Sequence, residues 1–203
     1  MNNVKEYISS GLLELYVAGI ATAKETAEVE QMAMMHTAIA DEIVAIAKSL
    51  KDYAAVKGVA PDPTIKPFLL ATIDYTERIK NGEVVNYPPA INKNSILADY
   101  ENWLNRNDMV APDNFDNIYA KIIGYTKEIT TAIVWIKEMA PHEVHDDEIE
   151  TFLIAEGSCN ITIGEKVHQL FAGDVLSIPL YLPHFVIVTS AIPCKIILQR
   201  IAA

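Results

Sequence analysis

The stretch that decides the fold begins at Glu143 and reads EVHDDEIETFLIAEGSCNITIGEKVHQLFAGDVLSIPLYLPH, ending at His184. Glu143 and His145 are two residues apart, so on a strand both side chains would project to the same face. Glu150 follows five residues after His145 and opens an apolar segment. His184 comes after a run with glycine and proline residues, which is typical of a strand that must turn and stop. These potential ligands, Glu143, His145, Glu150 and His184, predict a metal pocket inside a small β-barrel.

The spacings in this stretch resemble the two sequence motifs of the cupin family. The first motif ends in glutamate, six residues and glycine, as Glu150–Gly157 does. The second has glycine, five residues and proline, with a histidine further on, and Gly173–Pro179 and Pro179–His184 fit these spacings. The resemblance covers roughly residues 115–203. It implies a cupin (RmlC-like) domain, which is a double-stranded β-helix or jelly-roll barrel.

Four positions depart from the family's motifs. Lys137 replaces the leading glycine, Tyr181 the inner glycine of the second motif, and Val188 its asparagine. Glu143 stands where the family's first histidine would be. A carboxylate in place of a neutral imidazole adds a negative charge, which favours oxygen-preferring metals and weakens Lewis acidity. The resemblance implies one divalent ion, which could be Zn, Fe, Mn or Ni; the alternative is a cupin that has lost its metal.

The first third of the chain has the periodicity of amphipathic helices. Thr22 and Glu25 have the spacing of a capping box, and a later helix is predicted from Thr64 to Lys80. Two apolar stripes repeat at i, i+3, i+4 and i+7 or similar spacing: Val29, Met32, Ala33 and His36, then Ile39, Ile43, Ile46 and Leu50. The Met32, Met34, Met35 cluster is either an adaptable partner surface or core filling.

The helical third resembles the N-terminal anti-sigma domain of bacterial anti-sigma factors. The resemblance rests on YISSGLLELYVAGI from Tyr7, ETAEVE from Glu25, and His36, and it covers about residues 5–80. Zinc-bearing members of that family use a His-x3-Cys-x2-Cys motif. Here His36 would be the histidine, but Ala40 and Ile43 occupy the cysteine positions. The resemblance therefore implies that this domain binds no zinc. It also implies that apolar packing alone stabilises the domain.

An anti-sigma domain followed by a cupin is the arrangement of the ChrR-like anti-sigma factors. We therefore expect an α+β chain with a helical anti-sigma-like domain at 1–82, a linker with a short helix at 83–113, and a cupin domain at 114–203. The resemblance implies an anti-sigma factor that sequesters a sigma factor of the extracytoplasmic-function (ECF) class, with the metal-binding cupin as a sensory or stabilising module. Leu69 and Ile73 are the predicted partner-binding residues. The alternative is a metal-dependent cupin enzyme, a dioxygenase or isomerase, whose helices serve oligomerisation.

Composition excludes several other classes of protein. The 203 residues carry a net charge of −11, which argues against direct nucleic-acid binding. Apolar runs are too short to span a membrane, and the first residues lack the pattern of a signal peptide. Cys159 and Cys194 are too few for a disulfide framework, so we expect reduced thiols. These features predict a cytoplasmic protein. The resemblance to bacterial anti-sigma factors implies a bacterial one, and a homodimer is a further expectation.

Overall fold

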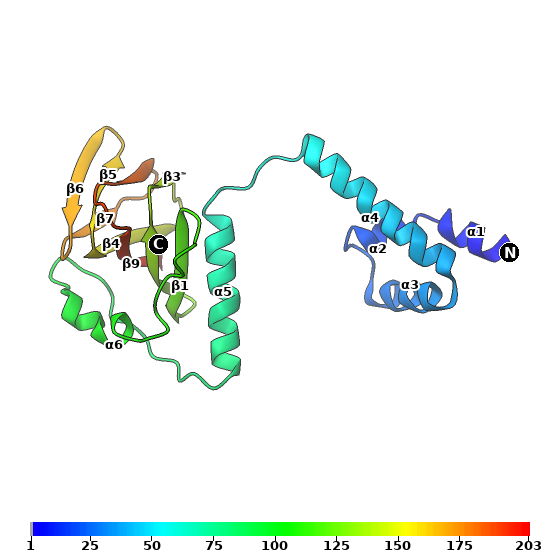
Figure 1. The fold of residues 1–203 in the computed structure, drawn as a ribbon, viewed down its shortest axis with the longest axis horizontal. Helices are drawn as coiled ribbons and strands as arrows, with labels where there is room; N and C mark the ends of the chain where they lie inside the picture. Colours follow the sequence, from blue (N-terminus) through cyan, green and yellow to red (C-terminus); the bar gives the residue numbers. More distant parts are fainter. Residues whose placement is uncertain (1) are drawn as a thin grey trace. The chain divides into compact units, whose positions relative to one another are not determined.

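The computed structural model describes residues 2–203, with side chains from Val4 onward, and it divides the chain into two compact units, Met1–Ala60 and Pro61–Ala203. The division falls earlier than the expected boundary at residue 82. The reason is that α5 (Ile65–Lys80) packs against β1 (Ile118–Tyr125) of the second unit, so it is part of that unit and not of the helical one (Figure 1). Within residues 2–203, no helix combines the length and hydropathy that a membrane span requires.

The first unit consists of four helices, α1 (Asn2–Ile8), α2 (Leu12–Val17), α3 (Ala23–Met35) and α4 (Thr37–Lys57). The predicted capping box is present: the Thr22 amide donates to Glu25 Oε2 at 2.8 Å, and the Glu25 amide donates to Thr22 Oγ1 at 3.3 Å. Leu13, Val29 and Ile39 are fully buried where the helices meet. The unit is therefore held by a small apolar core.

The second unit is an antiparallel β-sandwich of two sheets. One sheet has the strand order β1-β2-β9-β4-β7, and the other has the order β3-β8-β5-β6. This order is a jelly-roll arrangement, because neighbouring strands are mostly far apart in sequence. The remaining strands are β2 (Ile129–Ile136), β3 (Met139–Glu143), β4 (Glu148–Glu156), β5 (Ser158–Ile163), β6 (Lys166–Phe171), β7 (Val175–Ile178), β8 (His184–Val188) and β9 (Cys194–Ala202).

Helix α5 has two faces of different character. Phe68, Ala71 and Tyr75 pack against the core between the sheets, at the spacing of one side of a helix. Leu69 and Ile73, on another side of the helix, point to solvent, with 57% and 48% of their surfaces exposed. The two predicted partner-binding residues are thus accessible, and they lie on a helix of the sandwich unit.

The segment between α5 and β1 is not a linker between the two units, because it covers the outer face of the larger sheet. Tyr100 of η1 (Leu97–Tyr100), Trp103 of α6 (Glu101–Leu104) and Met109 are buried against residues of that sheet. Gln199 of β9 is fully buried and fixes the segment: its Oε1 accepts from the Ile91 amide at 2.7 Å. Residues 83–113 therefore belong to the folded sandwich unit.

Candidate metal centre

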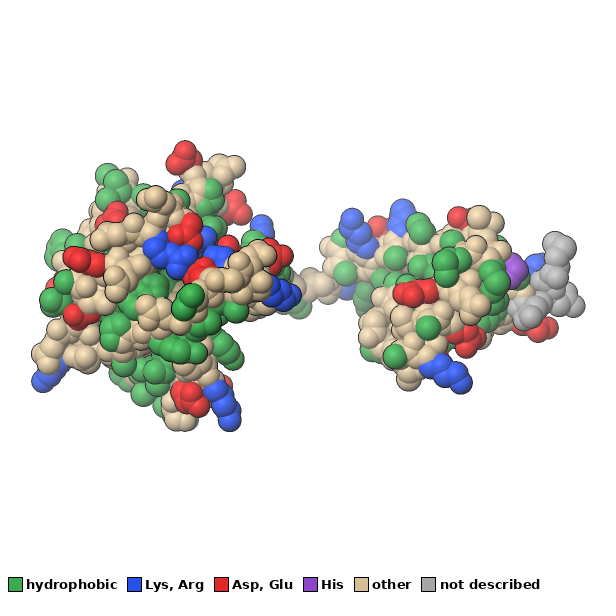
Figure 2. Space-filling model, turned by 90° about the horizontal axis from the view of Figure 1, so that it is seen from below, with side chains coloured by type: hydrophobic (Ala, Val, Ile, Leu, Met, Phe, Trp, Pro, Cys, Tyr) green, Lys and Arg blue, Asp and Glu red, His purple; other side chains and the backbone are tan. Residues whose placement is uncertain are grey.

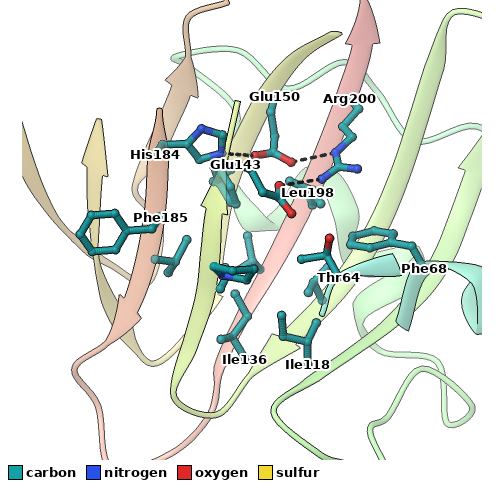
Figure 3. Close-up of a pocket in the computed structure, with 16 residues that line it drawn as sticks. Thr64, Phe68, Ile118, Ile136, Glu143, Glu150, His184, Phe185, Leu198 and Arg200 are labelled. Atoms are coloured by element: carbon teal, nitrogen blue, oxygen red, sulfur yellow. Dashed lines mark hydrogen bonds and ion pairs between the residues drawn. The ribbon is translucent and has the colours of Figure 1, made fainter. Parts of the chain in front are cut away.

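Strand register brings the four predicted ligands together. Glu143, at the end of β3, pairs directly with His184, at the start of β8. Glu150 lies in β4 and faces the same interior space, where it pairs with Arg200 of β9. His145 follows β3, and its carbonyl oxygen accepts a hydrogen bond from the Tyr181 amide at 2.8 Å. Figure 3 shows the side chains of Glu143, Glu150, His184 and Arg200 close to one another, although they come from four different strands.

The four side chains turn their donor atoms toward one another. One ligand atom from each of Glu143, His145, Glu150 and His184 lies within 4.8 Å of all the others. His184 Nε2 donates to Glu150 Oε2 at 3.1 Å. His145 Nε2 lies 3.5 Å from both Glu143 Oε2 and Glu150 Oε2. The donor atoms of the four predicted ligands therefore lie close together.

The carboxylate of Glu150 is buried next to two imidazoles and a guanidinium group. Burial by itself raises the pKa of Glu150, but the imidazoles of His145 and His184 and the guanidinium of Arg200 outweigh it and hold the pKa far below its usual range. Glu150 raises the pKa of His145 in return, and partial burial of the imidazole opposes that shift. Glu150 is therefore an anion at neutral pH, as a metal ligand must be.

The residues present fit a divalent metal ion. His145 Nε2 is buried and has no hydrogen-bond partner, although it points at two carboxylate oxygens. Buried polar nitrogens are rarely left unpaired, so an ion in this position would account for it. Donor atoms that surround one ion at about 2.0–2.2 Å lie at most about 4.4 Å apart. The observed limit of 4.8 Å needs only small side-chain shifts to reach that spacing.

A small cavity adjoins the four ligands. Its volume is about 30 Å³, and Glu143, Glu150 and His184 form its polar wall. Arg200 and Thr64, the N-cap of α5, are further polar lining residues, and most of the others are apolar, among them Phe68 of α5 (Figure 3). A space of this size holds a water molecule or an ion. Pockets for drug-sized ligands usually measure about 300–1,000 Å³.

His142 lies outside the group of ligands. On a regular strand, alternation turns His142 away from Glu143, and the β3–β8 register shifts between Ala140 and Glu143. The imidazole of His142 packs on Phe185, with the ring centroids 4.3 Å apart. It is therefore a packing residue, even though the bulge is present.

Arg200 is the residue of this site that our sequence analysis missed. Its Nε donates to Glu150 Oε1 at 2.8 Å, and its Nη2 donates to Glu143 Oε2 at 3.2 Å. The signal was present in the sequence, because Ile196, Leu198 and Arg200 alternate along β9 and the first two belong to the core between the sheets. A charged residue in line with two inward-facing apolar residues indicates an interior charge with a partner.

Comparison with known families agrees with the fold. The family profile described as "Cupin domain" matches residues 132–199, which form a cupin domain. The match begins in β2 and ends in β9. It includes all four predicted ligands and stops one residue before Arg200. No curated protein matches the chain.

Several solved structures resemble the sandwich unit. A predicted oxalate decarboxylase from Thermotoga maritima has a TM-score of 0.43 and 16% identity, over 48% of this chain and 97% of that chain. KdgF from Halomonas sp. has a TM-score of 0.42 and 16% identity, over 47% and 89%. The Cnp3 cupin domain of Schizosaccharomyces pombe has a TM-score of 0.42 and 10% identity, over 44% and 67%.

Proposed function

We propose that the chain is a metal-binding regulator, in which the helices capture a protein partner and the cupin domain responds to a divalent ion. Glu143, His145, Glu150 and His184 would hold the ion. Two imidazoles and two carboxylates suit Fe(II), Mn(II), Ni(II) or Zn(II). Such an ion supplies a strong positive charge and, where coordination positions stay open, Lewis acidity. The partner would be a sigma factor of the ECF class, as the resemblance of the helical third implies.

The observation that carries this proposal is the size of the space beside the ligands. The cavity of about 30 Å³ has room for an ion or a water molecule, while Thr64, the N-cap of α5, and Phe68 of α5 close one wall. An enzyme needs space for a substrate next to its metal, typically an order of magnitude more. This geometry favours binding of an ion over turnover of an organic substrate.

The first unit has the surface of a partner-binding module. Its fully buried core consists of Leu13, Val29 and Ile39, while large apolar side chains on α3 and α4 remain in solvent. Of the methionine cluster, Met32 packs on this core, but Met34 and Met35 are 82% and 57% exposed. Figure 2 shows such apolar side chains between charged ones on the first unit, in the right-hand part of the view. Adaptable thioethers in solvent favour recognition of another chain.

Capture of the partner tests the regulator directly. The full-length chain is co-expressed with the ECF sigma factor encoded next to its gene, and co-purification is measured. We expect the wild type to retain the sigma factor. The Leu69→Asp, Ile73→Asp variant should lose it, because a charge in an apolar contact costs about 2 kcal/mol or more. Val167→Asp, at an exposed position of β6, is the matched control and should bind like the wild type.

Two outcomes would contradict the proposal. If the wild type retains no sigma factor, the partner assignment is wrong. If the purified protein also converts a small substrate in a metal-dependent reaction, the alternative of a cupin enzyme takes its place. A third outcome would relocate the contact without contradicting the regulator. If the wild type and the Leu69→Asp, Ile73→Asp variant retain the sigma factor equally, the interaction lies on the first unit and not on α5.

A further inference from the structure

Arg200 pairs with two carboxylates that a metal ion would also bind. It contacts both carboxylates of the ligand group, through hydrogen bonds of 2.8 Å to Glu150 and 3.2 Å to Glu143. Its bond to Glu143 reaches Oε2, the same oxygen that faces His145 Nε2 at 3.5 Å. Arg200 therefore binds an atom that would coordinate the ion, and does not merely orient that ligand from behind.

The charges of the site indicate competition. Glu143 and Glu150 contribute two negative charges, and the guanidinium of Arg200 neutralises one of them in a largely buried place. A divalent ion among the ligands would neutralise both carboxylates and repel the guanidinium, because like charges a few ångströms apart disfavour each other in a low dielectric. Binding of the ion should thus weaken both ion pairs of Arg200.

The other side of Arg200 touches α5. The guanidinium carbon lies 4.9 Å from the centre of the Phe68 ring, a cation–π geometry. Phe68 and Thr64 line the same cavity as the ligands. The second half of α5 is fastened separately, since Arg78 donates to Asp74, Glu83 and the carbonyl oxygen of Ile122. The contact with Arg200 therefore lies in the first half of the helix, away from the Arg78 network.

We propose that Arg200 is an internal cation that competes with the metal ion for Glu143 Oε2, while it holds Glu150 through Oε1, the oxygen that does not face the imidazoles, and that release of Arg200 from Glu143 couples occupancy of the site to the first half of α5 through Phe68. This inference rests on the metal site of the proposed function, but it is independent of the sigma partner. Coupling between two sites is reciprocal. If binding of the ion weakens the contact between Arg200 and α5 by some factor, then loss of that contact strengthens binding of the ion by the same factor.

The experiment measures Zn2+ affinity by chelator competition and amide hydrogen exchange along α5 in the full-length protein. In the wild type, Zn2+ should speed amide exchange of residues 68–72 and leave residues 76–80 unchanged. In Arg200→Gln, Zn2+ should bind about tenfold more tightly, the usual effect of removing a neighbouring like charge. The same variant should lose the Zn2+-dependent change in α5. Phe68→Leu, which keeps apolar bulk without the ring, should also bind Zn2+ more tightly.

Leu70→Ala is the matched control, because Leu70 is 53% exposed on the same helix and does not line the cavity. It should bind Zn2+ like the wild type. Equal or weaker Zn2+ binding by Arg200→Gln would overturn the inference and leave the metal site standing, as would identical exchange of α5 with and without Zn2+. A wild type that binds no Zn2+, Mn2+, Fe2+ or Ni2+ would overturn the site itself. Circular dichroism of each variant verifies that it is folded.

Discussion

Tyr181 shows how a single backbone angle supports the site. Its φ of 63° lies in the left-handed region that favours glycine, and the cupin motif has glycine at this position. The turn is kept although the residue differs, because the Tyr181 amide donates to the carbonyl oxygen of His145 at 2.8 Å. The side chain of Tyr181 is 69% exposed, so side-chain burial offers little compensation for the strain. The turn holds the loop that carries a predicted ligand.

Tyr181→Gly should stabilise the protein. Relief of the left-handed conformation is worth about 1–2 kcal/mol, and the greater freedom of glycine in the unfolded chain offsets about half of that. We expect a gain of about 0.5–1 kcal/mol in the free energy of unfolding, measured by urea denaturation. Tyr181→Ala is the control, since alanine keeps the strain and should show no gain. A loss of stability in the glycine variant would mean that the ring contributes more than its exposure indicates.

At the scale of elements, the sequence predicted individual elements better than their environment. The apolar segment that opens at Glu150 lies in β4, and the Thr22 capping box located the start of α3. Periodicity also predicted α5, but it did not reveal which face is buried, because Phe68 and Leu69 are both apolar and adjacent. Packing of α5 against β1 determines that Phe68 is the residue that faces the core. The four predicted ligands could be proposed because Glu143, His145 and Glu150 are close in sequence and the second motif supplies His184. The Glu150–Arg200 pair depends on the β4–β9 register, which no local pattern contains.

Gln199 connects two elements that are distant in sequence. Its Nε2 donates to Thr131 Oγ1 at 2.9 Å, and its Oε1 accepts from the Ile91 amide. Gln199→Met preserves size but leaves the Ile91 amide buried without an acceptor, which should cost about 1–3 kcal/mol. The free energy of unfolding in urea measures the loss. Gln169→Met, on the exposed side of β6, is the control and should change stability by less than about 0.5 kcal/mol.

An ion-pair network fastens α5 to the covering segment and gives a pH-dependent contribution. Hydrogen bonds from Arg106, and also from Arg78, lower the pKa of Glu83, although partial burial opposes the shift. A carboxyl group whose pKa is lower in the folded state stabilises the fold above its unfolded pKa near 4.5, and this contribution is lost as the pH falls through the folded value.

Glu83→Gln should therefore destabilise the protein by about 1–2 kcal/mol at pH 7 and by progressively less below pH 4.5. Thermal unfolding of wild type and variant between pH 7 and pH 3 measures the difference. Glu165→Gln, in an exposed turn, is the matched control and should show no such convergence. A difference that stays constant over this range would contradict the assigned role of Glu83.

At the scale of the whole molecule, the two units differ in how much they bury. The first unit has three fully buried apolar residues at its centre, while the second has a core between its sheets and another beneath the covering segment. Stability grows with the apolar area removed from water, so the units should differ in stability. A weakly held helical unit also suits a module that a partner completes, since binding to the folded form adds stability.

We expect two unfolding transitions in calorimetry of the full-length chain. The first unit should unfold at the lower temperature, because its core is small, and the second at the higher temperature. Ile39→Ala should shift only the lower transition, and Ile154→Ala only the upper one, since each residue is fully buried in its own unit. One cooperative transition that both substitutions shift equally would contradict independent units.

Metal content is the measurement that tests the central claim most directly. Elemental analysis is carried out on the native wild type, on His145→Ala, His184→Ala, and on His36→Ala, His168→Ala as a control that removes two histidines outside the ligand group. We predict one divalent ion per chain in the wild type and in the control, and its loss in His145→Ala, His184→Ala, because four convergent donors would be reduced to two carboxylates. Equal metal content in all three proteins would contradict the assignment of these residues as the metal site.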